Sequence, residues 1–309
     1  MVKNYLWVIA VAVGLLCSCG DDGKSDASTD KTTPASTEKD TALSGDNIRV
    51  CSYNMLFEKT TPADVSKRWT YRVRIIMGIM DDYNLDIIGS QEALTWQVDK
   101  ILEKGKYDKV GWDIVGTHNA NYENDALFYL KSRFEVVEEG QFWYSETPQS
   151  WSWSWDATYA RACTWARFRE KNTLKEFYVF NTHIHHPNDN PIAHDQEVHL
   201  LVRMSSEINS EGLPMFYTGD FNSTPDRSGI TYITGDGEMS DSRVVATEVL
   251  GREQTYHNFS SDPNYGWRLD YIFVNNKVTV SKYRCEDSEL RTLQWGSDHH
   301  PIMIDAHLN

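Results

Sequence analysis

Short apolar or alternating runs recur along the chain after residue 47, and they predict β-strands. Two longer segments, 64–84 and 194–209, place apolar residues every three or four positions and predict helices, and a further helix is expected over 93–102. The predicted strands cover 48–53, 86–90, 112–117, 126–129, 161–169, 176–181, 214–218, 271–274, 279–285 and 302–307. Because strands outnumber the interspersed helices, the pattern favours a layered α/β fold over a sandwich or a bundle. Two sheets faced by helices would account for so many short strands, although the strand order does not follow from the pattern.

The first 18 residues have the pattern of a signal peptide. One positive charge, Lys3, precedes an apolar run over 5–16 that is short for a membrane span. The run ends in Leu-Cys-Ser-Cys-Gly, which resembles the bacterial lipobox, whose invariant Cys is lipidated, and Cys19 fits that position. We therefore expect 1–18 to be a lipoprotein signal peptide that directs export and anchoring in the outer membrane of a Gram-negative bacterium. Ordinary secretory cleavage nearby and an uncleaved anchor are the alternatives.

A polar segment separates this leader from the folded part. Residues 19–46 hold Ser, Thr, Asp, Lys, Gly and Ala with almost no large apolar side chain, so they cannot bury enough surface to fold. We expect a lipidated Cys and flexible tether over 19–46, followed by one domain over 47–309. With 309 residues, 40% of them hydrophobic, the chain is long enough for such a domain.

Charge and cysteine content narrow the classes of function. The net charge of −15 argues against binding long nucleic acid, which requires clustered Lys and Arg, although a metal ion can supply positive charge for a smaller phosphate substrate. Cys51, Cys163 and Cys285 are scattered, so we expect buried free thiols or one incidental bridge rather than a redox site.

Polar residues that can carry chemistry lie beside the ends of several predicted strands. They are Asn54, Gln91-Glu92, Asn181-Thr182-His183, Gly219-Asp220-Phe221-Asn222, Asp270 and Ser297-Asp298-His299-His300-Pro301. Groups at strand ends can converge on one edge of a sheet, where sites commonly form.

The types of these residues suit the hydrolysis of a phosphate ester. Glu92, Asp298 and the side-chain oxygen of Asn54 are hard ligands of the kind that Mg²⁺ prefers. Asp220 and Asn222, two positions apart on a turn, can orient the attacking water.

Two histidines can act as charged donors to the phosphate if a carboxylate holds each of them. We expect His299 to pair with Asp270 and His183 with Glu123, and Asp125 competes with Glu123 for the second pairing. Such pairing raises the pKa of a histidine and favours its charged form.

Taken together, the six groups and their order resemble the endonuclease/exonuclease/phosphatase superfamily, which includes pancreatic deoxyribonuclease and the deadenylases. The resemblance implies a four-layer αββα sandwich of two packed, mainly antiparallel sheets flanked by helices. It also implies Mg²⁺, for which Mn²⁺ can substitute, held by Asn54, Glu92 and Asp298. Asp220 would activate water, Asn222 would contact the phosphate, and His183 and His299, the latter paired with Asp270, would donate to it.

Within the superfamily, Phe-Trp-Tyr-Ser-Glu-Thr-Pro at 142–148 and Arg-Ala-Cys-Thr-Trp at 161–165 resemble a bacterial, deadenylase-related branch. Arg161 would reach a phosphate there. That branch carries Ala-Arg where this chain has Ala193-His194, which removes a reason to choose a particular anionic substrate.

Two further groups have an ordinary interpretation and a functional one. His185, His186 and His194 could bind a metal, but we expect solvated loop histidines. Trp151, Trp153 and Trp155 could stack on a sugar or a base, but we expect aromatic anchors of a loop.

The sequence thus predicts an extracytoplasmic Mg²⁺-dependent phosphoesterase that cleaves a diester or a monoester. The expected substrate is a small phosphorylated metabolite, a glycan or a lipid headgroup rather than long nucleic acid. We expect a monomer that meets the membrane only through its lipid. The alternatives are a nuclease and a catalytically silent, surface-exposed binding lipoprotein of the same fold.

Overall fold

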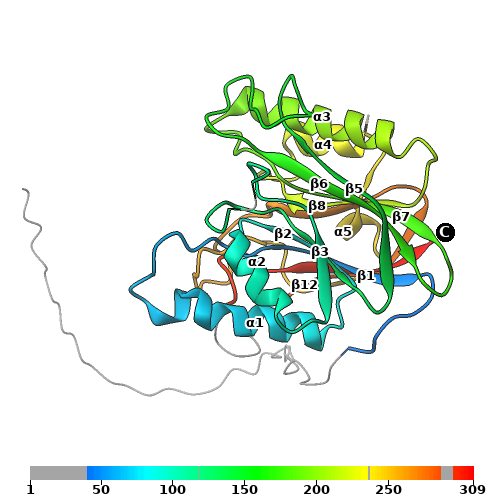
Figure 1. Cartoon of the computed structure of the whole chain (residues 1–309), viewed down its shortest axis with the longest axis horizontal. Helices are drawn as coiled ribbons and strands as arrows, with labels where there is room; N and C mark the ends of the chain where they lie inside the picture. Colours follow the sequence, from blue (N-terminus) through cyan, green and yellow to red (C-terminus); the bar gives the residue numbers. More distant parts are fainter. Residues whose placement is uncertain (1–39, 118, 236, 287–294) are drawn as a thin grey trace, which may run out of the picture. The chain divides into compact units, whose positions relative to one another are not determined.

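The computed structural model describes residues 40–309 except 118, 236 and 287–294. In this part of the chain, two mixed β-sheets pack against each other, and helices cover their outer faces (Figure 1). The seven-stranded sheet has the order β10 (Glu248–Leu250), β12 (Val278–Cys285), β13 (Ile302–Leu308), β1 (Asn47–Asn54), β2 (Ile87–Gln91), β4 (Leu127–Leu130), β3 (Tyr107–Val110). The six-stranded sheet has the order β5 (Phe134–Trp143), β6 (Ala162–Glu170), β7 (Glu176–His183), β8 (Met215–Asp220), β11 (Asp270–Val274), β9 (Ser240–Asp241).

Two groups of helices cover the sheets: η1 (Val65–Lys67), α1 (Trp69–Asp82) and α2 (Thr95–Leu102) on one side, and α3 (Pro191–Ile208) and α4 (Ser228–Thr234) on the other. The short α5 (Ser242–Val245) belongs to neither group and lies against β11 of one sheet and β12 of the other (Figure 1). Apolar residues of α1 and α2 pack on the seven-stranded sheet, and those of α3 and α4 pack on the six-stranded sheet. A third apolar core lies between the sheets, so the predicted four-layer αββα sandwich is confirmed.

Strand β1 illustrates how the sequence specifies these layers. Ile48 and Val50 contribute to the core between the sheets, whereas Cys51 and Tyr53 belong to the core under α1 and α2. Successive side chains of a strand point to opposite faces, so a central strand in a four-layer fold must be apolar on both. Antiparallel pairs predominate, as predicted, but β1 with β2, β7 with β8, and β10 with β12 are parallel.

The strand predicted over 112–117 is wrong. The buried carboxylate of Asp113 accepts hydrogen bonds from the backbone N–H groups of Val115 at 2.9 Å, Thr117 at 3.2 Å and Asn119 at 2.8 Å. An Asp side chain that accepts hydrogen bonds from several nearby backbone N–H groups favours a turn over the hydrogen-bond ladder of a β-sheet. Strand β5, which the pattern missed, alternates poorly because it is a mostly exposed edge strand rich in Glu.

The end of the segment 19–46, which the sequence predicts as a tether, contacts the domain. The N–H of Asp40 donates to the carbonyl of Asp82 at 2.9 Å, and its carbonyl accepts from Asn84 at 2.6 Å. These bonds place residue 40 beside the end of α1. The predicted signal peptide, Cys19 and the rest of the tether lie outside the described residues.

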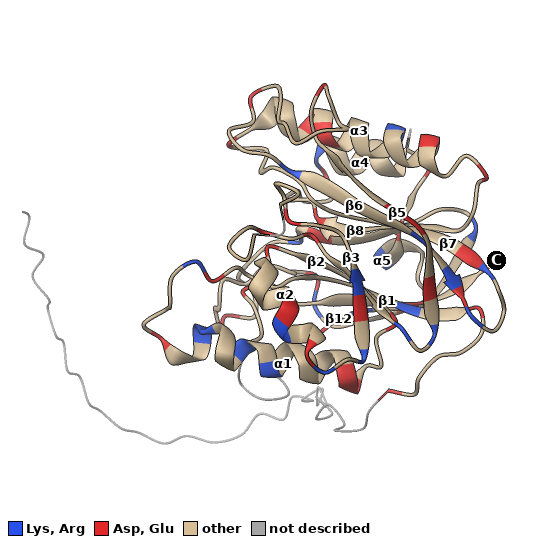
Figure 2. Ribbon diagram, viewed as in Figure 1, with Lys and Arg blue, Asp and Glu red and all other residues tan. Residues whose placement is uncertain are grey.

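The three cysteines that follow residue 47 are buried. Cys51 and Cys163 are free thiols, and Cys285 is buried too. Among residues 40–309, apart from the undescribed gaps, no helix is both long and apolar enough to span a bilayer. Figure 2 shows Asp and Glu interspersed with Lys and Arg on α1, α3 and the outer strands.

A buried network of polar side chains joins the two sheets. The side-chain oxygen of Asn181 on β7 accepts from Gln91 on β2 at 2.7 Å and from Thr218 on β8 at 3.0 Å. Its amide nitrogen donates to the carbonyl of Ser90 at 2.8 Å. Buried hydrogen bonds between side chains of different strands hold those strands in a fixed relative position. These bonds therefore set the spacing between the ends of β2, β7 and β8.

Gly89 leaves the room that this network needs. A Cβ there would lie 2.2 Å from Thr218 Oγ1 and 2.3 Å from Asn181 Oδ1. Gly89→Ala should therefore destabilise the fold by about 1–3 kcal/mol, the usual cost of overpacking. The measurement is urea unfolding followed by circular dichroism.

Gly78→Ala in α1 is the matched control. Its Cβ would meet no described atom within 4 Å outside its own stretch of helix. This variant should stabilise the fold by about 0.4–1 kcal/mol, because alanine restricts the unfolded chain. Equal unfolding midpoints for the two variants would contradict this account of Gly89.

Candidate active site

The predicted site residues come together at one edge of the paired sheets. Asn54 ends β1, Glu92 follows β2, His183 ends β7, Asp220 ends β8, Asp270 begins β11 and His299 shortly precedes β13. Because β7 and β8 run parallel, their carboxyl ends are adjacent, and the antiparallel β11 pairs Asp270 directly with Asp220. The fold thus delivers residues from six separate segments to one place.

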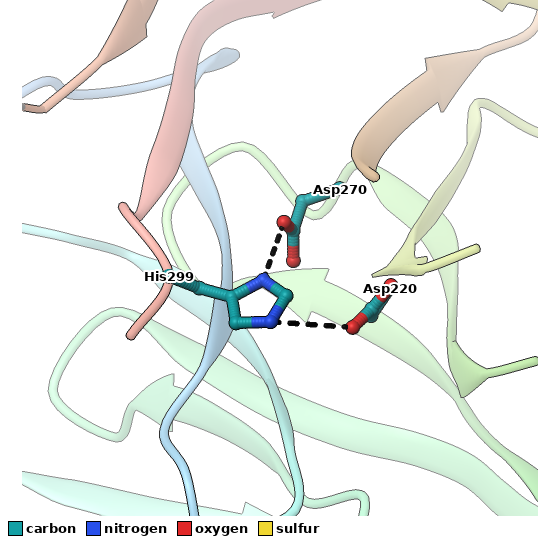
Figure 3. A group of neighbouring side chains, drawn as sticks. All are labelled: Asp220, Asp270 and His299. Atoms are coloured by element: carbon teal, nitrogen blue, oxygen red, sulfur yellow. Dashed lines mark hydrogen bonds and ion pairs between the residues drawn. The ribbon is translucent and has the colours of Figure 1, made fainter. Parts of the chain in front are cut away.

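His299 lies between two carboxylates (Figure 3). Its Nδ1 donates to Asp270 Oδ2 at 2.8 Å, and its Nε2 lies 3.7 Å from Asp220 Oδ2. Burial opposes the charged imidazole, but the charge of Asp270, the hydrogen bond to it and the charge of Asp220 together raise the pKa of His299 well above its usual value. The predicted pairing of His299 with Asp270 is present, and His299 is a cationic donor at neutral pH.

Asp220 is oriented by groups on both of its oxygens. The N–H of Asn222 donates to Oδ1 at 2.9 Å, and the amide nitrogen of Asn54 donates to Oδ2 at 3.0 Å. Burial and the negative charge of Asp270 raise the pKa of Asp220 to about 6, against the opposing effect of His299. A carboxylate with that pKa can accept a proton from water near neutral pH.

Glu92 has the properties of a metal ligand. Burial, followed by the charge of Asp298, raises the pKa of Glu92 to about 7. Its φ of 66° is in the left-handed region, which a non-glycine residue adopts at a cost that is common at functional sites. A divalent cation would relieve the repulsion between these two carboxylates, and their oxygens suit a hard ion. The residues therefore fit the implied metal.

The third predicted ligand, Asn54, is oriented differently from the prediction. Its amide nitrogen donates to Glu92 Oε1 at 2.9 Å, while its oxygen accepts from the N–H of Leu56 at 3.1 Å. The side-chain oxygen is thus occupied by the backbone, and Asn54 here orients Glu92 and Asp220 as a donor.

A second set of donors converges closely enough to hold a metal. The donor atoms of Asp220, Asp270 and His299 lie within 4.8 Å of one another. In this set the charged His299 lies between the two carboxylates, and a metal that it ligated would have to displace its proton. The pair Glu92 and Asp298 consists of carboxylates alone, so we favour it as the metal site.

His183 differs from the prediction in both partner and charge. Its Nε2 accepts from Arg161 at 3.2 Å and from the amide of Asn222 at 3.1 Å. Burial and the charge of Arg161 lower the pKa of His183 well below its usual value, so the ring is neutral. The expected pairing with Glu123 is wrong, because the Glu123 carboxylate instead accepts from Arg161 at 3.3 Å and from Lys59 at 3.2 Å.

Arg161 is consequently the positive group on this side of the site. Its side chain is 12% exposed, and it bridges Glu123 and His183. Asp125, the alternative partner for His183, is buried, and burial raises its pKa to about 8 despite the charge of Arg161. The predicted contact of Arg161 with phosphate stays a prediction.

His185, in the loop after β7, and His194, on α3, are buried, which corrects the expectation of solvated loop histidines. His185 Nδ1 lies 2.5 Å from Glu197 Oε1, and His194 Nε2 lies 2.6 Å from Ser223 Oγ. His194 occupies the position where the related branch has Arg, and it fixes the residue next to Asn222. Among the described residues, the donor set that is close enough to hold a metal includes none of His185, His186 and His194.

Two cavities meet at this edge, and both are lined by Glu92 and His183. The catalytic cavity, of about 540 Å³, is lined in addition by Asp220, Asn222, Asp298 and His299. The aromatic cavity, of about 560 Å³, is lined in addition by Lys59, Glu123, Arg161 and several aromatic residues.

The sequence profile of the Endonuclease/Exonuclease/phosphatase family matches residues 51–299. The chain belongs to this family. It is similar to the solved structure of an endonuclease/exonuclease/phosphatase from Bacteroides vulgatus, with 31% identity, a TM-score of 0.79, and coverage of 85% of this chain and 99% of that one. A mannosyl-6-phosphatase from Bacteroides thetaiotaomicron is 29% identical with a TM-score of 0.76, covering 84% of this chain and 99% of its own. An uncharacterized protein of Acanthamoeba polyphaga mimivirus is 28% identical over 252 residues, which are 77% of this chain and 91% of the relative.

Membership confirms the predicted family and shows that the protein is a phosphoester-hydrolysing enzyme. The two Bacteroides structures agree with the bacterial branch that the motifs indicated. The roles of individual residues rest on the geometry described above.

The His299–Asp270 pair makes a prediction about pH dependence. Asp270→Asn removes the negative charge that raises the pKa of His299, so the imidazolium should lose its proton at a lower pH. The alkaline limb of the kcat/KM profile should move to lower pH, and kcat/KM at neutral pH should fall by about 10²-fold or more. Profiles of wild type and variant that superimpose would remove His299 from the role of cationic donor.

Proposed function

We propose that the protein is an extracytoplasmic phosphoesterase that depends on Mg²⁺, with Mn²⁺ as a substitute. The observation that carries this proposal is the charged His299, held by Asp270 beside Asp220, at the same sheet edge as the carboxylates Glu92 and Asp298. A proton acceptor, a cationic donor and a cation-binding pair are what the attack of water on a phosphate ester requires.

The described residues divide the chemistry among them. Asp220 takes the proton of the attacking water, since its pKa lies near the working range. His299 donates a charge-assisted hydrogen bond to a phosphate oxygen, where negative charge grows in the transition state. Asn222 and Arg161 contact the remaining phosphate oxygens. When bound, a divalent cation supplies positive charge to those oxygens.

A small phosphorylated sugar or metabolite is the substrate class that we favour. The net charge of −15 and the interspersed charges of Figure 2 suit a small substrate better than a long nucleic acid, which binds to a concentrated basic surface. The similarity to a mannosyl-6-phosphatase supports a sugar phosphate. A lipid headgroup is the next candidate in this class.

The location of the enzyme is inferred from the N-terminal sequence. The signal-like segment 1–18 and the lipobox-like sequence at Cys19 support export and lipid anchoring in an outer membrane. We propose that the catalytic domain is a monomer that reaches the membrane through this lipid alone.

The test is a substrate panel with the purified domain and Mg²⁺. The panel holds hexose 6-phosphates, ethyl phosphate, bis-p-nitrophenyl phosphate, sphingomyelin, short RNA and single-stranded DNA. We expect the highest kcat/KM for a sugar phosphate. A preference for RNA or DNA would favour the nuclease, and no turnover of any substrate would favour the silent binding protein.

A further inference from the structure

The aromatic cavity is lined by aromatic side chains, which take no part in the hydrolysis of a phosphate ester. Five aromatic side chains line it: Phe57, Tyr122, Trp151, Trp153 and Tyr159. Each of them is between 37% and 49% exposed. Large aromatic residues normally bury most of their surface, so five partly exposed ones around one cavity indicate a binding surface.

The two tryptophans are held in place by the loop that carries them. Their ring centroids are 5.5 Å apart with an interplanar angle of 63°. Ser152, which lies between them, contacts Ser145 Oγ at 2.6 Å and donates to the carbonyl of Ser150 at 2.8 Å. The exposed rings are therefore preorganised, and little ordering cost is added when a ligand binds.

Polar groups in the same cavity suit hydroxyl groups. The Glu123 carboxylate lies between Lys59 at 3.2 Å and Arg161 at 3.3 Å, so acceptors and donors alternate along this wall. A sugar ring offers an apolar C–H face to aromatic rings and hydroxyls that both donate and accept. The wall carries two cations, Lys59 and Arg161, beside two carboxylates, Glu123 and Glu92, and so lacks the concentrated positive charge that binding a polynucleotide requires.

The position of the cavity relative to Asp220 indicates which part of the substrate it receives. In phosphoryl transfer, the attacking and leaving oxygens lie roughly in line on opposite sides of phosphorus. Asp220, the proton acceptor, lines the catalytic cavity and not the aromatic cavity, and the two cavities share Glu92 and His183. For a phosphate bound at these shared residues, water held by Asp220 would attack from the catalytic cavity, which leaves the aromatic cavity for the departing alcohol.

We propose that the aromatic cavity binds the sugar ring of the leaving group, and that Trp151 and Trp153 select carbohydrate phosphates over other esters. This inference rests on the proposed phosphoesterase activity and adds the site, and the two residues, that recognise the sugar. It assigns a substrate role to two tryptophans that the sequence alone marked as loop anchors. No covalent step beyond ester hydrolysis is involved.

The experiment compares selectivity in three proteins: wild type, the double variant W151A/W153A, and the matched control W151F/W153F, which keeps flat aromatic rings. Selectivity is kcat/KM for mannose 6-phosphate or glucose 6-phosphate divided by kcat/KM for ethyl phosphate, which has no ring. We expect W151A/W153A to lower this ratio at least about tenfold, mainly through KM, and W151F/W153F to retain most of it. Thermal unfolding shows whether each variant is folded.

The outcomes separate the two proposals. If wild type hydrolyses neither a phosphomonoester nor a phosphodiester, the proposed function fails. If wild type hydrolyses ethyl phosphate but W151A/W153A leaves the ratio unchanged, the function stands and the sugar site is overturned. If the ratio falls for adenosine monophosphate and not for the hexose phosphates, the cavity receives a base, and the proposal is likewise overturned.

Discussion

Replacing Asp220 by asparagine should lower kcat by about 10²–10⁴-fold and leave the domain folded. The carboxylate is buried, it is oriented by Asn222 and Asn54, and its pKa of about 6 suits a proton acceptor. Asparagine keeps the shape of the side chain and can still accept from the N–H of Asn222, but it cannot take a proton from water. The measurement is phosphate release under saturating substrate, with thermal unfolding of both proteins.

Asp99→Asn is the matched control for this change. Asp99 is an exposed carboxylate on α2, and it is not one of the site residues described above. Its replacement removes the same charge at a position outside the site. Its kcat should stay within about twofold of wild type, because surface charge contributes little to such a step. If Asp220→Asn retained the same kcat as Asp99→Asn, Asp220 would not be the proton acceptor.

The layers of the fold were predictable because the apolar pattern of a strand or helix depends only on residues close together in the sequence. Alternating and 3.6-residue apolar patterns arise from burial on two faces of a strand or one face of a helix, as Val50 and Cys51 on β1 illustrate. The failure at 112–117 has a local cause too, but a subtle one. The Asp113 carboxylate accepts hydrogen bonds from three backbone N–H groups and so favours a turn over a strand. The apolar pattern contains no sign of this effect.

The convergence of the predicted site residues at one edge could be expected from the sequence, whereas several of their contacts could not. Motifs at strand ends brought Asp220, Asp270 and His299 together as expected, because the fold fixes where strands end. Contacts between side chains of different loops depend on angles that a sequence does not give. Thus Glu123 binds Arg161 and Lys59 instead of His183.

The charge of His183 was missed for the same reason. A histidine near a carboxylate was expected to be charged, but burial and the neighbouring guanidinium of Arg161 leave it neutral. The aromatic cavity could not be predicted from the sequence either, because Phe57, Tyr122 and Tyr159 lie far apart in it. Only the tryptophans of the short run near residue 151 form a pattern that the sequence reveals.

Removing divalent cations should lower activity at least about 10²-fold, and added Mg²⁺ or Mn²⁺ should restore it. Burial, followed by the charge of Asp298, raises the pKa of Glu92 to about 7, so Glu92 is readily protonated near neutral pH when no cation is bound. A cation bound there would favour the ionised form. The measurement is phosphate release after dialysis against a chelator, followed by titration with each metal.

A second readout separates metal binding from activity. A cation that binds only the folded state raises its stability by mass action, so Mg²⁺ should raise the Tm of the metal-free wild type. Glu92→Gln removes one of the two opposed carboxylates, so the same Mg²⁺ concentration should raise its Tm far less. Asp99→Asn, with the same loss of charge outside the site, should respond as wild type does. Chelator-insensitive hydrolysis, together with a Tm that Mg²⁺ does not change, would mean that the pair of carboxylates serves another purpose.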